Sequence, residues 1–299
     1  MATRSKGAGA GIGWLTNGIR AGFGHPKLLF GGAALLTVAC LLPSLITMPM
    51  QFLAMRGGTP PSSATSAAIM LISVLYGLLV VPLYAGYLQL VDAAETGRPA
   101  RVTDIFRPYR EGEALRLIGL GLLNLVIYIG GIALIVFATG RGLVGWYLQA
   151  KVAQINHQPP PALPDGFWTT MALLMVFALW MMGYYAISLG QVALNKRGVF
   201  GAVGDGLSGA LKNALPLFTF ALCSFLVWLG VIVVFAIVAL LLILLAELVS
   251  HWLTVVLLVP LYIGLLLFMF STMFGVTYHL WRDVCADDVG NVAPPPLIA

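Results

Sequence analysis

The sequence has 299 residues, of which 60% are hydrophobic and 9% are charged, and its mean hydropathy is +0.96. Soluble domains carry about 25% charged residues, so this composition excludes an ordinary soluble protein. The formal net charge of +5 is modest, and no nucleic-acid partner is expected. Cys40, Cys223 and Cys285 lie far apart, which excludes a CxxC motif and a disulfide framework.

Six apolar stretches are long enough to cross a membrane as helices, because about 18 apolar residues suffice. The spans are expected at residues 28–46, 67–91, 117–138, 168–193, 215–245 and 253–278. Amphipathic lead-in helices are predicted at 14–27 and 199–214, each directly before a span. A short interfacial helix is predicted from Leu143 to Ile155. Pro82 and Pro260 are expected to kink the second and sixth spans.

The Gly-rich residues 1–12 and the residues 285–299 are predicted to be disordered tails around one transmembrane domain, residues 13–284. The basic start is not followed by an apolar region with a cleavage site, so no signal peptide is expected.

The basic residues are distributed unequally between the two sides of this six-span arrangement. Thirteen of the 16 fall on the side of the two termini, and Arg56, Arg141 and Lys151 fall on the other. The positive-inside rule therefore predicts that both termini lie in the cytoplasm. A bacterial inner membrane is the expected location.

Short strings recur along the chain and predict an internal repeat. Val81-Pro82-Leu83-Tyr84 returns as Val259-Pro260-Leu261-Tyr262, and Met182-Gly183-Tyr184-Tyr185 stands in the corresponding place of a middle unit. We expect three helical hairpins, at about 13–97, 98–198 and 199–284, in a pseudo-threefold or 2+2+2 arrangement. Chance likeness among apolar segments is the alternative.

Tyr84, Tyr185 and Tyr262 lie near the Pro and Gly breaks, and Asn124 is a polar residue inside the third span. Broken helices often mark binding sites in membrane proteins, so these four residues are candidates for lining a cavity. The alternative is that the tyrosines only pack, with each hydroxyl bonded to a carbonyl freed by the helix break.

No catalytic, cofactor-binding or metal-binding site is predicted. Gly204-Asp205-Gly206-Leu207-Ser208-Gly209 matches GxGxxG, but it follows a membrane span where a nucleotide site needs a strand. The 11 acidic residues lie in loops, tails or span ends, which disfavours an ion-coupled pump. The charged stretch from Arg98 to Arg116 either holds anionic headgroups or neutralises itself by internal pairing.

Several segments occur in an order that resembles a bacterial family of six-span inner-membrane proteins labelled the BPSS1780 family. They are Gly13-Trp14, Gly18, Pro26, Leu79 to Gly86, Gly97-Arg98-Pro99, Asp104-Ile105-Phe106, Tyr185 to Leu194, Gly209-Ala210, Asn213 to Phe218, Pro260 and Tyr278 to Val284. The resemblance covers most of residues 13–284 and implies a six-span fold in the inner membrane. It assigns no functional site.

These observations favour a non-enzymatic integral membrane protein in contact with membrane lipids. A scaffold or accessory subunit of another membrane protein, or an envelope-protective role, is the first hypothesis. The alternative is a passive transporter or lipid-handling protein with a site between the hairpins.

Overall fold

The computed structural model of the chain describes residues 3–55, 62–247 and 250–285. In these residues all regular structure is helical, and six helices are long and apolar enough to span a membrane. They are α2 (Pro26–Met55), α3 (Ser63–Glu95), α5 (Ala114–Thr139), α7 (Phe167–Ala193), α9 (Ala214–Glu247) and α10 (His251–Cys285). The predicted all-α, six-span fold is confirmed. A helix suits these stretches because it satisfies every interior backbone group without water.

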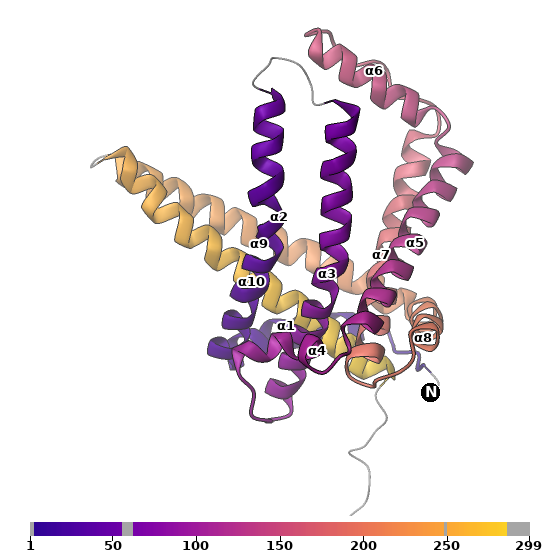
Figure 1. Cartoon of the computed structure of the whole chain (residues 1–299), viewed down its shortest axis with the longest axis vertical. Helices are drawn as coiled ribbons and strands as arrows, with labels where there is room; N and C mark the ends of the chain where they lie inside the picture. The colour runs from indigo at the N-terminus through magenta and orange to yellow at the C-terminus, as the bar shows by residue number, and fades with distance from the viewer. Residues whose placement is uncertain (1–2, 56–61, 248–249, 286–299) are drawn as a thin grey trace, which may run out of the picture.

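Five short elements lie at the ends of the spans (Figure 1). They are α1 (Ala10–Gly24), the 3-10 helix η1 (Val102–Phe106), α4 (Arg107–Arg110), α6 (Leu143–Ile155) and α8 (Val199–Lys212). α6 has the bounds predicted for the interfacial helix, and α1 and α8 are the predicted lead-in helices. α1, α4 and α8 gather at one end of the molecule, whereas α6 lies at the opposite end (Figure 1).

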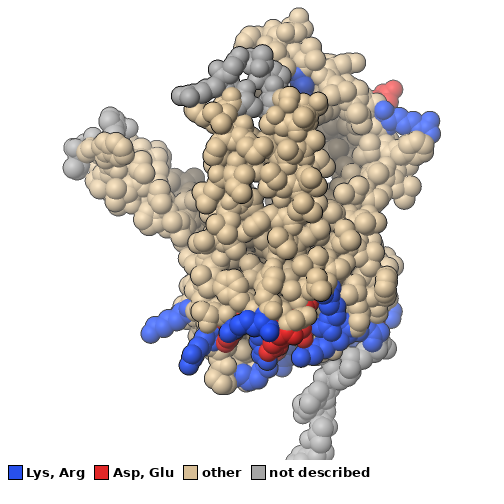
Figure 2. All heavy atoms as spheres, viewed as in Figure 1, with Lys and Arg blue, Asp and Glu red and all other residues tan. Residues whose placement is uncertain are grey.

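Figure 2 shows that most visible lysine and arginine side chains surround the end that carries α1, α4 and α8, hereafter the charged end. Arg141 and Lys151 belong to the segment around α6, at the opposite or outer end. The surface between the two ends is almost free of charge in this view. This is the distribution expected of a chain that crosses a hydrocarbon layer.

Adjacent spans pair as hairpins, α2 with α3, α5 with α7 and α9 with α10. The short element before each hairpin (η1 before α5, α8 before α9 and α1 before α2) is its lead-in element. Each packs against the last span of the preceding hairpin, with the third hairpin counted as preceding the first: η1 on α3, α8 on α7, and α1 on α10. The contact between α1 and α10 joins the first hairpin to the third, so the three units follow one another in a closed cycle at the charged end.

Glycines permit these contacts by bringing backbones together. A Cβ added at Gly18 of α1 would lie 2.7 Å from the Val276 nitrogen of α10, and Gly275 would meet the Gly18 backbone in the same way. At Gly86 of α3 an added Cβ would lie 2.7 Å from the Ile105 carbonyl carbon of η1. Small residues replace the hydrophobic effect as the basis of packing here, because lipid is as apolar as the helices.

Residues 3–9 form an ordered segment, in contrast to the predicted disorder of residues 1–12. The Asn213 side chain donates to the Arg4 carbonyl at 2.9 Å and accepts from the Lys6 amide at 2.8 Å, while the Arg4 amide donates to the Val284 carbonyl at 3.0 Å. These bonds give the Gly-rich segment backbone partners that composition alone does not reveal. The predicted disorder of the other tail lies outside the described residues, except that Cys285 ends α10.

The core is concentrated near the charged end, where Tyr87, Leu117, Ile187, Ala202 and Val284 are almost fully buried. Toward the outer end the spans separate, and α9 and α10 lean away from the other four (Figure 1). Large apolar side chains in the outer halves of these two helices are exposed, among them Leu241, Leu245, Val256 and Tyr262. In a membrane this surface contacts lipid.

Prolines lie inside three of the spans, and the helices continue through Pro82 of α3 and Pro260 of α10. In α2, Pro43 has no N–H to donate to the Ala39 carbonyl, and the Tyr76 hydroxyl donates to that carbonyl at 2.6 Å. Pro82 lies in the half of α3 near the charged end, whereas Pro260 lies in the outer half of α10. The recurrent Val-Pro-Leu-Tyr strings therefore do not occupy equivalent positions.

We expect Gly18→Ala to lower the unfolding free energy by about 1–3 kcal/mol, because its Cβ would overlap the α10 backbone. Gly13→Ala on the same helix is the control, since an added Cβ there meets nothing within 4 Å. Thermal unfolding of both variants in detergent measures the difference. Equal stability of the two variants would contradict the close contact between α1 and α10.

Candidate functional site

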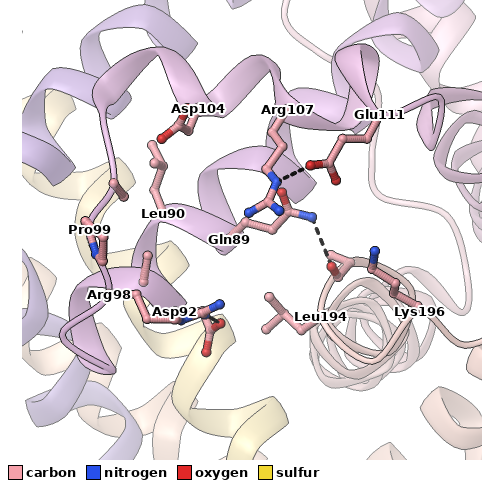
Figure 3. Close-up of a pocket in the computed structure, with 13 residues that line it drawn as sticks. Gln89, Leu90, Asp92, Arg98, Pro99, Asp104, Arg107, Glu111, Leu194 and Lys196 are labelled. Carbon is pink, nitrogen blue, oxygen red and sulfur yellow. Dashed lines mark hydrogen bonds and ion pairs between the residues drawn. The ribbon is translucent and has the colours of Figure 1, made fainter.

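The first hollow beside the helices that hold the predicted site residues lies at the charged end. This charged pocket has a volume of about 330 Å³ and lies between the end of α3, the η1–α4 segment and the end of α7 (Figure 3). Its lining residues are Gln89, Leu90, Asp92, Ala93, Arg98, Pro99, Ala100, Asp104, Arg107, Glu111, Ala193, Leu194 and Lys196. Gln89 connects two of its walls, because its Nε2 donates to the Ala193 carbonyl at 3.0 Å.

The charges of this pocket pair with one another. Arg98 pairs with Asp92, Arg107 Nε donates to Glu111 at 2.6 Å, and Arg110 Nη2 lies 3.0 Å from Asp104. The backbone N–H of Arg101 donates to the Asp104 carboxylate at 2.8 Å, and this bond chiefly holds the pKa of Asp104 below its ordinary value. The arrangement fits the self-neutralising alternative for the 98–116 stretch better than a site for anionic headgroups.

The second hollow, hereafter the lateral recess, opens between α3, α5 and α7 within the apolar zone. Its volume is about 450 Å³ and its lining is almost wholly apolar. The lining residues are Val74, Gly77, Leu78, Val81, Gly121, Asn124, Leu125, Tyr128, Ala178, Met181, Met182 and Tyr185. Figure 2 shows the surface hollowed between α3 and the α5–α7 pair, above the charged end.

Asn124 is a buried amide in the lining of the lateral recess, which also holds Tyr128 and Tyr185. The residue is 7% exposed, and its Oδ1 accepts a hydrogen bond of 2.5 Å from the Tyr184 hydroxyl of α7. The Nδ2 atom is buried and has no hydrogen-bond partner among the residues that the structure describes. An unpaired amide donor in an apolar setting costs about 1–3 kcal/mol, so the recess holds one unmet hydrogen-bonding demand.

The α7 wall is held from behind by α8. Asp205 of α8 accepts from Gln191 Nε2 at 2.7 Å, and its carboxylate lies 2.6 Å from Arg197 Nε. A Cβ on Gly206 would lie 2.8 Å from the Tyr184 carbonyl oxygen. The GxGxxG string is thus part of a helix that packs closely behind Tyr184, as expected for small residues in a helix interface.

The four predicted cavity residues are only partly brought together. Asn124 and Tyr185 line the lateral recess. Tyr84 instead packs on Phe274, with ring centroids 5.8 Å apart, and its hydroxyl lies 3.8 Å from the Cys40 sulfur. Tyr262 is 55% exposed. It lies on the outer half of α10, at a different depth from Tyr84.

Pro260, near Tyr262, lines a third hollow, an apolar groove of about 710 Å³ between α9 and α10. Gly77, expected from the sequence as a small residue at a helix contact, instead leaves the recess open, and Tyr184, one of the tyrosines near the Pro and Gly breaks, orients Asn124. The available sequence signal for Tyr184 was that it adjoins Tyr185, while Asn124 is a lone asparagine inside another span.

Among the described residues, no group of three or more His, Cys, Asp or Glu side chains could hold a metal ion. The lateral recess offers shape, apolar surface, the buried amide donor of Asn124 and the rings of Tyr128 and Tyr185 with their hydroxyls. These are properties that suit the binding of an apolar molecule.

Comparison with known proteins found no matching family model, no matching curated protein and no matching solved structure.

Proposed function

We propose that the chain is a non-enzymatic protein of the bacterial inner membrane that binds a membrane amphiphile in the lateral recess, as a lipid-handling protein or passive carrier. The unpaired Nδ2 of Asn124 supports this proposal most strongly, because buried donors in native proteins rarely lack a partner. The recess volume of about 450 Å³ falls in the range of about 300–1,000 Å³ that is typical of ligand pockets. Its opening between spans gives access from the bilayer.

The location follows from charge and hydropathy. The concentration of basic residues at the charged end supports a cytoplasmic position for that end and for both termini. The resemblance to the BPSS1780 family points to the same membrane. Lipids are then the natural partners of the exposed apolar surface, with no cofactor and no nucleic acid required.

A second candidate is the scaffold or accessory role, including protection of the envelope. The outer halves of α9 and α10 favour it, because they expose a long apolar surface and an open groove of about 710 Å³ beside Pro260. Another membrane protein with an apolar helix would fit this hairpin. If the recess does not bind an amphiphile, the next experiment is a pull-down that searches for such a partner.

We expect purified wild-type protein to retain an apolar amphiphile that Gly77→Phe loses, because the new ring would fill the recess without a clash. A Cβ at Gly77 meets nothing within 4 Å. Gly130→Phe is the matched control, since Gly130 of α5 is equally unobstructed and does not line the recess. Native mass spectrometry with lipid extraction measures retention, and equal retention by the three proteins would refute the recess as the site.

The proposed orientation predicts the labelling of single cysteines in a chain whose three native cysteines are replaced by alanine. In intact cells, a membrane-impermeant maleimide should label Gln158→Cys, which follows α6, whereas Arg110→Cys on α4 should react only after the membrane is opened. The reverse labelling pattern would place the charged end outside the cytoplasm.

A further inference from the structure

The depth of Asn124 in the membrane restricts what the lateral recess can bind. Arg116 marks the charged end of α5, where its guanidinium donates to the carbonyls of Val192 and Lys196 at 3.1 and 3.2 Å. Asn124 lies about two turns further along α5, which places it about 12 Å deeper at 1.5 Å per residue. The headgroup layer occupies about 5–8 Å on each side of a hydrocarbon core about 30 Å thick. Asn124 therefore lies within the hydrocarbon, below the headgroups.

The unmet group at this depth is a hydrogen-bond donor. Asn124 Oδ1 is used by the Tyr184 hydroxyl, whereas Nδ2 has no partner in the part of the chain that the structure describes. A carbonyl oxygen is the matching acceptor that a predominantly apolar molecule can carry into hydrocarbon. The ester carbonyls of a diacyl phospholipid lie at the boundary of the hydrocarbon, so they fit this depth less well than a carbonyl on an apolar ring.

The walls of the recess suit a flat ring with a tail. Tyr128 and Tyr185 present aromatic rings, and Met181 and Met182 supply flexible, polarisable side chains that adapt to irregular shapes. Gly77 leaves open space on the α3 wall, whereas Gly121 of α5 packs against the Val81 and Leu78 side chains of α3. Figure 2 shows that this hollow faces the apolar zone rather than the charged end.

We propose that the lateral recess binds a carbonyl-bearing ring amphiphile of the isoprenoid quinone class, with a ring carbonyl accepting a hydrogen bond from Asn124 Nδ2 and the tail leaving between the spans. This inference rests on the proposed function, because it names the ligand class of the same recess. It concerns binding, and the ring is neither oxidised nor reduced by the chain.

The test titrates detergent-purified protein with three probes and measures apparent Kd by native mass spectrometry. The probes are decyl-benzoquinone, decylbenzene as its carbonyl-free counterpart, and dioleoyl phosphatidylglycerol. We expect the wild type to bind the quinone about 5–10-fold more tightly than decylbenzene, the contribution of one hydrogen bond. Asn124→Leu should abolish that preference, because it removes the donor from the lining of the recess.

Tyr184→Phe is the control for the internal hydrogen bond. It removes the hydroxyl that orients Asn124 through Oδ1 but leaves Nδ2, so the quinone preference should weaken without being abolished. The ratio of the wild-type Kd values for decylbenzene and decyl-benzoquinone is measured without any variant. It therefore tests the ligand class even if Asn124→Leu fails to fold.

Two contrary outcomes separate this inference from the proposed function. If the wild type binds both decyl probes equally, or prefers the phospholipid, and Gly77→Phe still abolishes binding, the recess binds amphiphiles but the ligand class is wrong. If Gly77→Phe leaves the binding of all three probes unchanged, the proposed function fails together with this inference.

Discussion

Close contact between helix backbones at glycine positions is the constraint on which this structure depends. Gly18 meets Gly275, Gly86 meets the Ile105 carbonyl, and Gly206 meets the Tyr184 carbonyl. Each contact joins a lead-in element to the last span of the preceding hairpin. Hydrophobic burial provides little net attraction between helices in lipid, so packing of this kind must hold them together. The core accordingly forms at the charged end, where these elements lie.

The open features of the outer half follow from that arrangement. Beyond the level of the lead-in elements the spans separate, and α9 and α10 lean away from the rest (Figure 1). The lateral recess lies where α3 separates from α5 and α7. A buried polar pair, Asn124 with Tyr184, lies inside this apolar region and gives the recess a directed amide group. The open shape of the lateral recess and the access to its polar group thus both follow from where the small residues lie along the chain.

Sequence reasoning recovered the features that hydropathy controls. Six spans, the interfacial helix at 143–155 and the segregation of charge all appear in the structure. It failed where similar sequence strings lie at different depths in the bundle. Tyr84 is packed against Phe274, whereas Tyr262 is exposed in the outer half of α10. On a helix that is apolar on every side, periodicity does not show which residues face other helices and which face lipid. The partnership of Asn124 with Tyr184, which are 60 positions apart, likewise requires the fold.

Residues 3–9, before the first unit, lie against the end of α8 in the third, and this contact is a second connection that closes the cycle of units. The most direct measurement is oxidative cross-linking of Ser5→Cys with Lys212→Cys in a cysteine-free chain, since the Ser5 hydroxyl donates to the Lys212 carbonyl at 3.1 Å. Ser5→Cys with Arg110→Cys, on α4 at the same end, is the control. The account predicts an intramolecular disulfide in the first pair and none in the second. Cross-linking of the control pair alone, or only between molecules, would contradict it.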